Sequence, residues 1–351
     1  MREETCIPNV NHWLATVVWL AAFTGGGVSS TLAATRPEAD AVRAAVAKAV
    51  PLLEAGARGS AEKRKNCFTC HNQALPVIAL TTARARGLAV DAENLRQQLD
   101  FTAAHLARNQ TNYQAGKGQG GQALTAGYAL LTLEFGGRAP DATTAAVVEY
   151  LLRWHKDLDY WKPQSIRPPS EASLFTMNFV GLRALKRFGT AEQQERIAQR
   201  TAQVRAWMLK TPAKDTEDRA FRLWALRVAE AVSEELRHAA EELLKTQGED
   251  GGWAQLPDLA SDAYATGTAL VALHQAGVLA ATDAAYQRGL AWLLAAQRAD
   301  GSWHVKTRST PIQAYYESGY PHGDDQFISI TAAGWATTAL ALALPTVPAK
   351  P

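Results

Sequence analysis

The sequence has almost no excess of charge of either sign. Its 351 residues include 36 Lys and Arg against 34 Asp and Glu, a formal charge of +2. No long basic run is present either, so the electrostatic footprint of a nucleic-acid-binding protein is missing. We therefore exclude DNA and RNA as partners.

Strand-like alternation of apolar and polar residues is also almost absent. Apolar residues instead recur at helical spacing in one Ala- and Leu-rich segment after another. Several small-residue segments end at a glycine, which is typical of a helix C-terminus. These glycines are Gly87, Gly136, Gly189 and Gly277. The three intervals between successive glycines are about one, one and two periods of roughly 45 to 50 residues.

More charged helical segments alternate with these small-residue segments, and most begin near Asp, Glu, Ser or Thr. We predict an all-α protein, a ring of about six inner and six outer helices formed by a single domain over residues 37–346. The loops before the inner helices are long and should lie together on one rim. Long loops on a rigid scaffold commonly carry functional sites.

The N-terminal segment differs in composition from the rest. The stretch "HWLATVVWLAAFTGGGVSSTLAA" is apolar and then rich in small residues. It predicts a signal peptide over residues 1–34, or an uncleaved N-terminal anchor, and no other membrane-spanning helix. The location would be periplasmic or otherwise exported, and cleavage would remove Cys6.

Cysteine is scarce, and the two cysteines that would remain after cleavage of the signal peptide belong to one motif. Cys67, Cys70 and His71 form C-x-x-C-H in "NCFTCHNQ", placed just before an inner helix that should begin near Asn72. Two thiols at this spacing can form a disulfide, bind a metal or bond a haem. The adjacent histidine favours covalent haem c, with His71 as the proximal iron ligand.

Candidates for the remaining positions of the site lie on the rim loops. His304 and His322 are the better-placed second iron ligands, because Met177 and Met208 lie within helices. Aromatic loop residues either wall an apolar ligand cavity or cover the core. These residues are Trp161, Trp253, Trp303, Tyr264, Tyr316 and Phe327.

A short repeat, Q-x-x-D-G-x-W, follows two of the charged helices. Its members are Gln247, Asp250, Gly251 and Trp253, matched by Gln297, Asp300, Gly301 and Trp303. The repeat resembles the Q-W repeats of squalene–hopene cyclases and, more loosely, those of protein prenyltransferase β subunits, most clearly over residues 233–344. The resemblance implies an α/α toroid.

The same resemblance limits the reactions that the chain could catalyse. The cyclases use a D-x-D-D acid motif, which this sequence lacks. Asp262 lies at the place taken as equivalent and is therefore a candidate acid. Asp324 and Asp325, on the rim, are two further candidates. Each of the three could instead be a helix cap or a loop charge. The zinc site of the prenyltransferases needs a later cysteine, and none follows Cys70.

Three functions stay open at this point. The first is an exported toroid with covalent haem c and a redox role, whose partner is a redox protein or an apolar small molecule. The second is a terpenoid-cyclase-type enzyme without haem. The third is a non-catalytic binding or scaffold toroid with a Cys67–Cys70 disulfide.

Overall fold

The structure is a computed structural model that describes residues 37–311 and 314–347. Within these ranges the chain is helical, and the nearest approach to a strand is an isolated bridge between Ala254 and Ser261. No helix of the described ranges is long and apolar enough to cross a membrane. The predicted signal peptide over residues 1–34 lies outside them.

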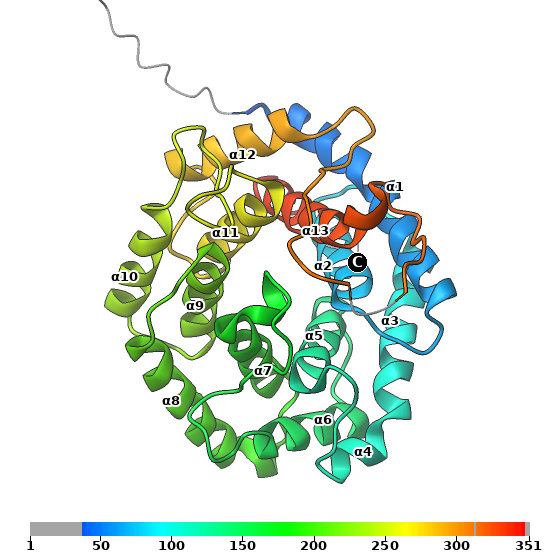
Figure 1. Cartoon of the computed structure of the whole chain (residues 1–351), viewed down its shortest axis with the longest axis vertical. Coiled ribbons are helices and arrows are strands. Elements are labelled where there is room, and N and C mark those ends of the chain that lie inside the picture. The colour runs from blue at the N-terminus through cyan, green and yellow to red at the C-terminus, as the bar shows by residue number, and fades with distance from the viewer. Residues whose placement is uncertain (1–36, 312–313, 348–351) are drawn as a thin grey trace, which may run out of the picture. The chain divides into compact units, whose positions relative to one another are not determined.

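Six inner helices form a closed ring, in which each contacts the next and the last contacts the first (Figure 1). The prediction of an all-α toroid is therefore confirmed. In chain order these helices are α2 (Leu75–Ala85), α5 (Gln122–Phe135), α7 (Leu174–Phe188), α9 (Thr216–Val228), α11 (Ala263–Gln275) and α13 (Gln326–Leu342).

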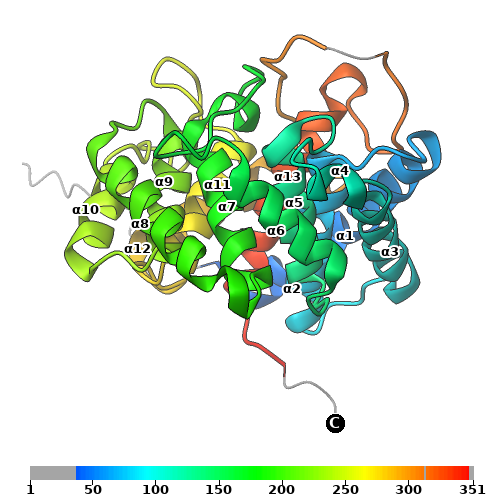
Figure 2. The same ribbon diagram turned by 90° about the horizontal axis from the view of Figure 1, so that it is seen from below.

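A second layer of helices surrounds this ring, and the long loops gather on one of its two faces (Figure 2). The short α4 continues α3, so the outer layer also has six members. The outer helices are α1 (Ala39–Lys63), α3 (Ala92–Arg108) with α4 (Gln110–Gln114), α6 (Ala142–Arg153), α8 (Gln194–Lys210), α10 (Ser233–Leu244) and α12 (Ala284–Ala296).

Small residues allow the inner helices to pack closely. A Cβ atom at Gly267 of α11 would lie 2.7 Å from the backbone nitrogen of Ala336 in α13. One at Gly334 of α13 would lie 2.9 Å from the Cβ of Leu75 in α2. Because any larger residue would force these helices apart, the composition of the inner segments follows from the radius of the ring.

The turn at residues 247–253 joins neighbouring outer helices. The Gln247 amide donates hydrogen bonds to Gly251 O (2.8 Å) and to Ala285 O of α12 (2.9 Å). Gly251 has a φ of +88°, and a Cβ there would lie 2.8 Å from Arg288 O. The buried Trp253 donates through Nε1 to Leu243 O of α10 (3.0 Å). The repeat is thus a seam, in which Trp253 satisfies a carbonyl in the last turn of α10 and Gln247 ties the turn to α12.

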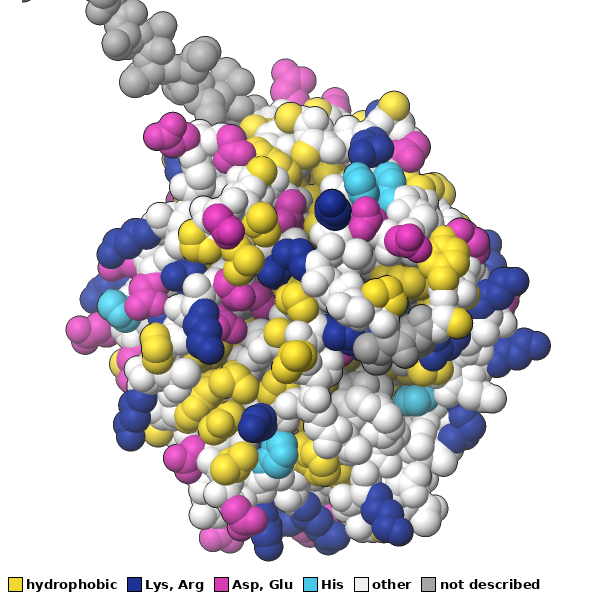
Figure 3. All heavy atoms as spheres, in the orientation of Figure 1, with side chains coloured by type: hydrophobic (Ala, Val, Ile, Leu, Met, Phe, Trp, Pro, Cys, Tyr) yellow, Lys and Arg dark blue, Asp and Glu magenta, His cyan; other side chains and the backbone are white. Residues whose placement is uncertain are grey.

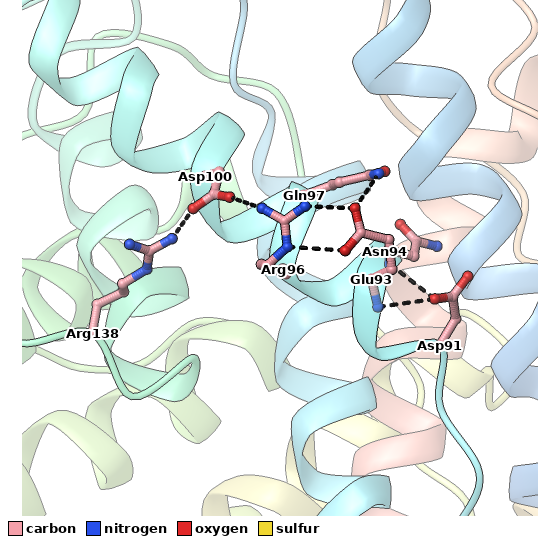
Figure 4. A network of polar contacts seen from close by, with 7 residues as sticks. All are labelled: Asp91, Glu93, Asn94, Arg96, Gln97, Asp100 and Arg138. Atoms are coloured by element: carbon pink, nitrogen blue, oxygen red, sulfur yellow. Dashed lines mark hydrogen bonds and ion pairs between the residues drawn. The ribbon is translucent and has the colours of Figure 1, made fainter.

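The outer surface carries an exposed polar network on α3 (Figure 4). The Asp91 carboxylate caps the helix by accepting from the backbone nitrogens of Glu93 and Asn94, both at 3.0 Å. Arg96 pairs with Glu93 and Asp100, and Asp100 also pairs with Arg138, which follows α5. Exposed pairs of this kind contribute little to stability.

Candidate functional site

A cavity of 410 Å³ opens among the long loops. Its wall includes Cys70 and His71 at the start of the first inner helix, and Tyr128 of α5. The loop before α7 adds Arg167 and Glu171, and further residues come from α11, α13 and the loop before α13. Figure 3 shows this face, on which charged and hydrophobic side chains lie close together.

The segment that carries Cys70 and His71 is itself helical and spans the predicted helix start near Asn72. A π-turn over Cys70–Ala74 leads directly into α2. Gln73 accepts hydrogen bonds from the Thr69 backbone nitrogen (2.9 Å) and hydroxyl (2.7 Å), and Asn72 donates to Gly56 O of α1 (3.1 Å). These buried bonds fix the motif against the outer layer. π-turns are often found at functional sites.

The imidazole of His71 is held neutral. Burial, followed by the nearby charges of Arg167 and Arg64, lowers the pKa of His71 to about 3. Its Nε2 is buried and has no hydrogen-bond partner among the described residues. Its ring meets the Phe327 ring edge-on, with centroids 5.1 Å apart. A neutral, unpartnered imidazole nitrogen is the form that coordinates a metal.

Both thiols of the motif are free, so the disulfide that the scaffold alternative requires is not formed in the structure. Burial, with a smaller contribution from Glu171, raises the pKa of Cys70 to about 12. Its Sγ lies 4.0 Å from His71 Nδ1. The free Cys70 thiol and the orphaned His71 nitrogen lie in the cavity wall and supply two of the three groups that attach haem c, whereas Cys67 does not line the cavity.

The structure does not bring the two candidate second ligands to His71, and neither lines the cavity. His304 Nε2 is bonded to Asp325 Oδ2 (2.8 Å), and its Nδ1 accepts from Arg298 (3.1 Å). His322 Nε2 is bonded to Ser302 Oγ (2.9 Å). In the described ranges no group of three or more His, Cys, Asp and Glu side chains could hold a metal ion.

The three carboxylates singled out from the sequence have different environments. Asp262 caps α11 by accepting from Ala265 N (2.9 Å) and does not line the cavity. Burial raises the pKa of Asp262. Although burial alone would raise it, hydrogen bonds from Thr307 N and His304 hold the pKa of Asp325 below its usual range. Only Asp324 of the three lines the cavity.

The aromatic residues singled out from the sequence fall into two groups, those at the cavity and those buried in the seams. Tyr264 and Phe327 line the cavity, whereas Tyr316 packs against Phe327 with ring centroids 5.1 Å apart. The expectation that the tryptophans wall the cavity is corrected, because each is buried in a seam and bonded through Nε1 to an outer-helix carbonyl. The pairs are Trp161 with Leu151, Trp253 with Leu243 and Trp303 with Leu293.

Glu217, in the first turn of α9, was not predicted from the sequence. The buried carboxyl accepts from Thr176 Oγ1 of α7 (2.6 Å) and from the hydroxyl of Tyr264 (3.0 Å), which lines the cavity. Burial, with the nearby Asp215 and Asp218, raises the pKa of Glu217 to about 8. The group therefore holds its proton at neutral pH.

A pattern that could have revealed this residue is "DTED", residues 215–218. It places three carboxylates at the start of an inner helix and differs from D-x-D-D only by a glutamate at the third position. Asp215 caps α9 through Asp218 N (2.9 Å), and Asp218 accepts from Ser173 Oγ (2.7 Å). Asp262, the acid chosen from the sequence, instead caps α11 outside the cavity wall.

The chain is similar in fold to two solved enzymes. The apo type II terpene cyclase MstE from Scytonema is 18% identical, with a TM-score of 0.53, over 89% of this chain and 100% of that one. A glycosidase solved in complex with glucose is 13% identical, with a TM-score of 0.54, over 86% and 98%. No family model and no curated protein matches the sequence. These likenesses show the fold, a toroid of the kind that both enzymes have.

Proposed function

We propose that the chain is an exported haem c protein with a redox role. Cys67 and Cys70 would form the two thioether bonds, and His71 Nε2 would be the axial ligand. The observation that carries the proposal is the buried, unpartnered Nε2 of a neutral imidazole beside a free thiol in the cavity wall. A bound haem supplies an iron that accepts and releases one electron.

The residues of the chain have separate roles in this proposal. The bonds of Gln73 and Asn72 hold the turn, so the imidazole is oriented before anything binds. Phe327 packs against the ring and shields it from water. The partner would be a redox protein or a small molecule that enters the cavity, whose wall includes the charged residues Arg167, Glu171 and Asp324.

Co-expression of the full chain with haem c maturation machinery tests the proposal. The wild type should show a Soret band and keep its haem on a denaturing gel. Cys70→Ala should reduce retained haem strongly, whereas the matched histidine variants His304→Ala and His322→Ala should retain wild-type staining. A folded but colourless wild type in the exported fraction would contradict the proposal.

A second candidate, an acid-catalysed enzyme of the cyclase kind, is favoured by Glu217. A carboxyl that stays protonated at neutral pH and bonds to a cavity tyrosine has the properties of a general acid. Product analysis with squalene-like polyenes tests this role. Glu217→Gln should abolish turnover and Asp262→Asn, at a helix cap, should largely retain it, while absence of product from the wild type would exclude these substrates.

A further inference from the structure

Two charged residues close to the motif form a pair in the cavity wall. Arg167 and Glu171 both line the cavity with Cys70 and His71. Arg167 Nε donates to Glu171 Oε2 (2.8 Å), and a second nitrogen donates to Oε1. The two side chains are 29% and 19% exposed, so the pair is largely withdrawn from water.

The charge of Arg167 acts on two of the three motif residues, His71 and Cys70. After burial, it is the largest cause that lowers the pKa of His71. At Cys70, where burial and Glu171 raise the pKa, Arg167 acts in the opposite direction. A guanidinium therefore lies beside the motif on a separate element, the loop that precedes α7.

A haem brings two carboxylates into whatever site holds it. Burial of a carboxylate without a cation or hydrogen-bond donor costs free energy that the bound state must recover elsewhere. An arginine fork matches a carboxylate in shape, and its five N–H donors can serve two carboxylates at once. The pair with Glu171 engages two of its nitrogens, Nε and Nη2.

We infer that Arg167 binds a carboxylate of the haem and that Glu171 holds the guanidinium in place for it. This inference rests on the proposed haem attachment and assigns a role to residues outside the C-x-x-C-H motif. Arg167 would thus be a cofactor-binding residue and Glu171 a positioning residue. The positive charge near the iron would also favour the reduced state, because the ferric form carries one charge more.

Three variants of the full haem-loaded chain test the inference. Arg167→Gln should shift the propionate-bending band in the resonance Raman spectrum and change the redox equilibrium about tenfold toward the oxidised form, about 59 mV for one electron. Arg167→Lys keeps the charge but not the fork, so the potential should stay near that of the wild type while the band still shifts. Glu171→Gln should raise the potential.

Arg153→Gln is the matched control, since Arg153 pairs with Glu149 on α6 and does not line the cavity. Its Raman band and potential should equal those of the wild type. A haem-loaded Arg167→Gln protein with an unchanged band and potential would overturn the inference while leaving the haem proposal intact. A wild type without haem would overturn both.

Discussion

The turn at residues 247–253 and the turn at residues 297–303 make the same contacts at two different joints of the ring. Gln247 reaches Ala285 of the next outer helix, α12, whereas Gln297 reaches Ala45 of α1 (2.9 Å), the first helix of the chain. The same turn is thus used once between successive repeats and once to close the ring. Closure of the ring therefore needs no additional structural element.

The cavity wall differs from these seams in how its polar groups are paired. In the seams, the Gln and Trp side chains of the repeat are paired with backbone carbonyls. In and behind the cavity wall, His71 Nε2 has no partner among the described residues and Glu217 keeps a proton while buried. We therefore expect the seams to contribute to stability, whereas the cavity retains groups that are costly to bury, as functional sites commonly do.

The largest expected effect comes from the closing seam. Gly301 has a φ of +91°, and a Cβ there would lie 2.6 Å from Lys48 O of α1. Gly301→Val should lower the free energy of unfolding by at least about 3 kcal/mol, measured by urea titration. The control Gly137→Ala has a similar φ of +75° but nothing within 4 Å, and should cost only about 1 kcal/mol.

Substitution of Glu217 should raise the free energy of unfolding at alkaline pH, whereas the glycine substitution lowers it. Its folded pKa, about 8, lies above the ordinary 4.5, so the folded state binds more protons than the unfolded state between these values. The contribution of Glu217 to stability should therefore fall as pH rises from about 4.5 to 8, and Glu217→Gln should remove that contribution to the slope.

At pH 8 the Glu217→Gln variant should be more stable than the wild type by about 2 kcal/mol or more, an order-of-magnitude value. Urea titrations at pH 5 and pH 8 measure the difference between the slopes. Equal slopes for variant and wild type would mean that Glu217 ionises normally in the folded protein.

The two repeat glutamines compare the joints directly. Gln297→Ala removes hydrogen bonds to Gly301 O (3.0 Å) and Ala45 O, and should cost about 2 kcal/mol. Gln247→Ala removes the corresponding pair and an exposed hydrogen bond from Arg288, and should cost the same within error because exposed contacts of this kind contribute little. A clearly larger loss at Gln297 would show that closure depends on this turn more than an ordinary joint does.

The smallest effect is expected at the exposed network on α3 (Figure 4). Arg96 pairs with Glu93 and Asp100 on the solvent side of the helix. Arg96→Ala should leave the urea midpoint unchanged within error at physiological salt, because exposed ion pairs are screened and flexible. A midpoint shift as large as that of Gln297→Ala would contradict the view that the seams hold the ring.

The architecture could be predicted because it depends on local patterns. Gly267 and Gly334 mark helices that must approach closely, and Gln247 and Gln297 carry a turn with one geometry wherever it occurs. Helix spacing and turn chemistry are written in short stretches of sequence, so the number and order of the helices followed from them.

The site could be predicted only in part. The motif marked Cys70 and His71, which line the cavity, and Cys67, which does not, but Arg167 lies about a hundred residues further along the chain in a segment with no motif. Trp161 and Asp262 were misplaced because a loop aromatic and a loop carboxylate look alike in sequence whether they face a cavity or a seam. That choice is made by tertiary packing.

The most direct test of the haem assignment is the mass of one peptide. Trypsin should release Asn66–Arg84, which contains both cysteines and His71. From a chain co-expressed with haem maturation machinery, this peptide should carry the added mass of one haem, and the same peptide from Cys67→Ala, Cys70→Ala protein should not. Recovery of the wild-type peptide only at its unmodified mass would contradict the account.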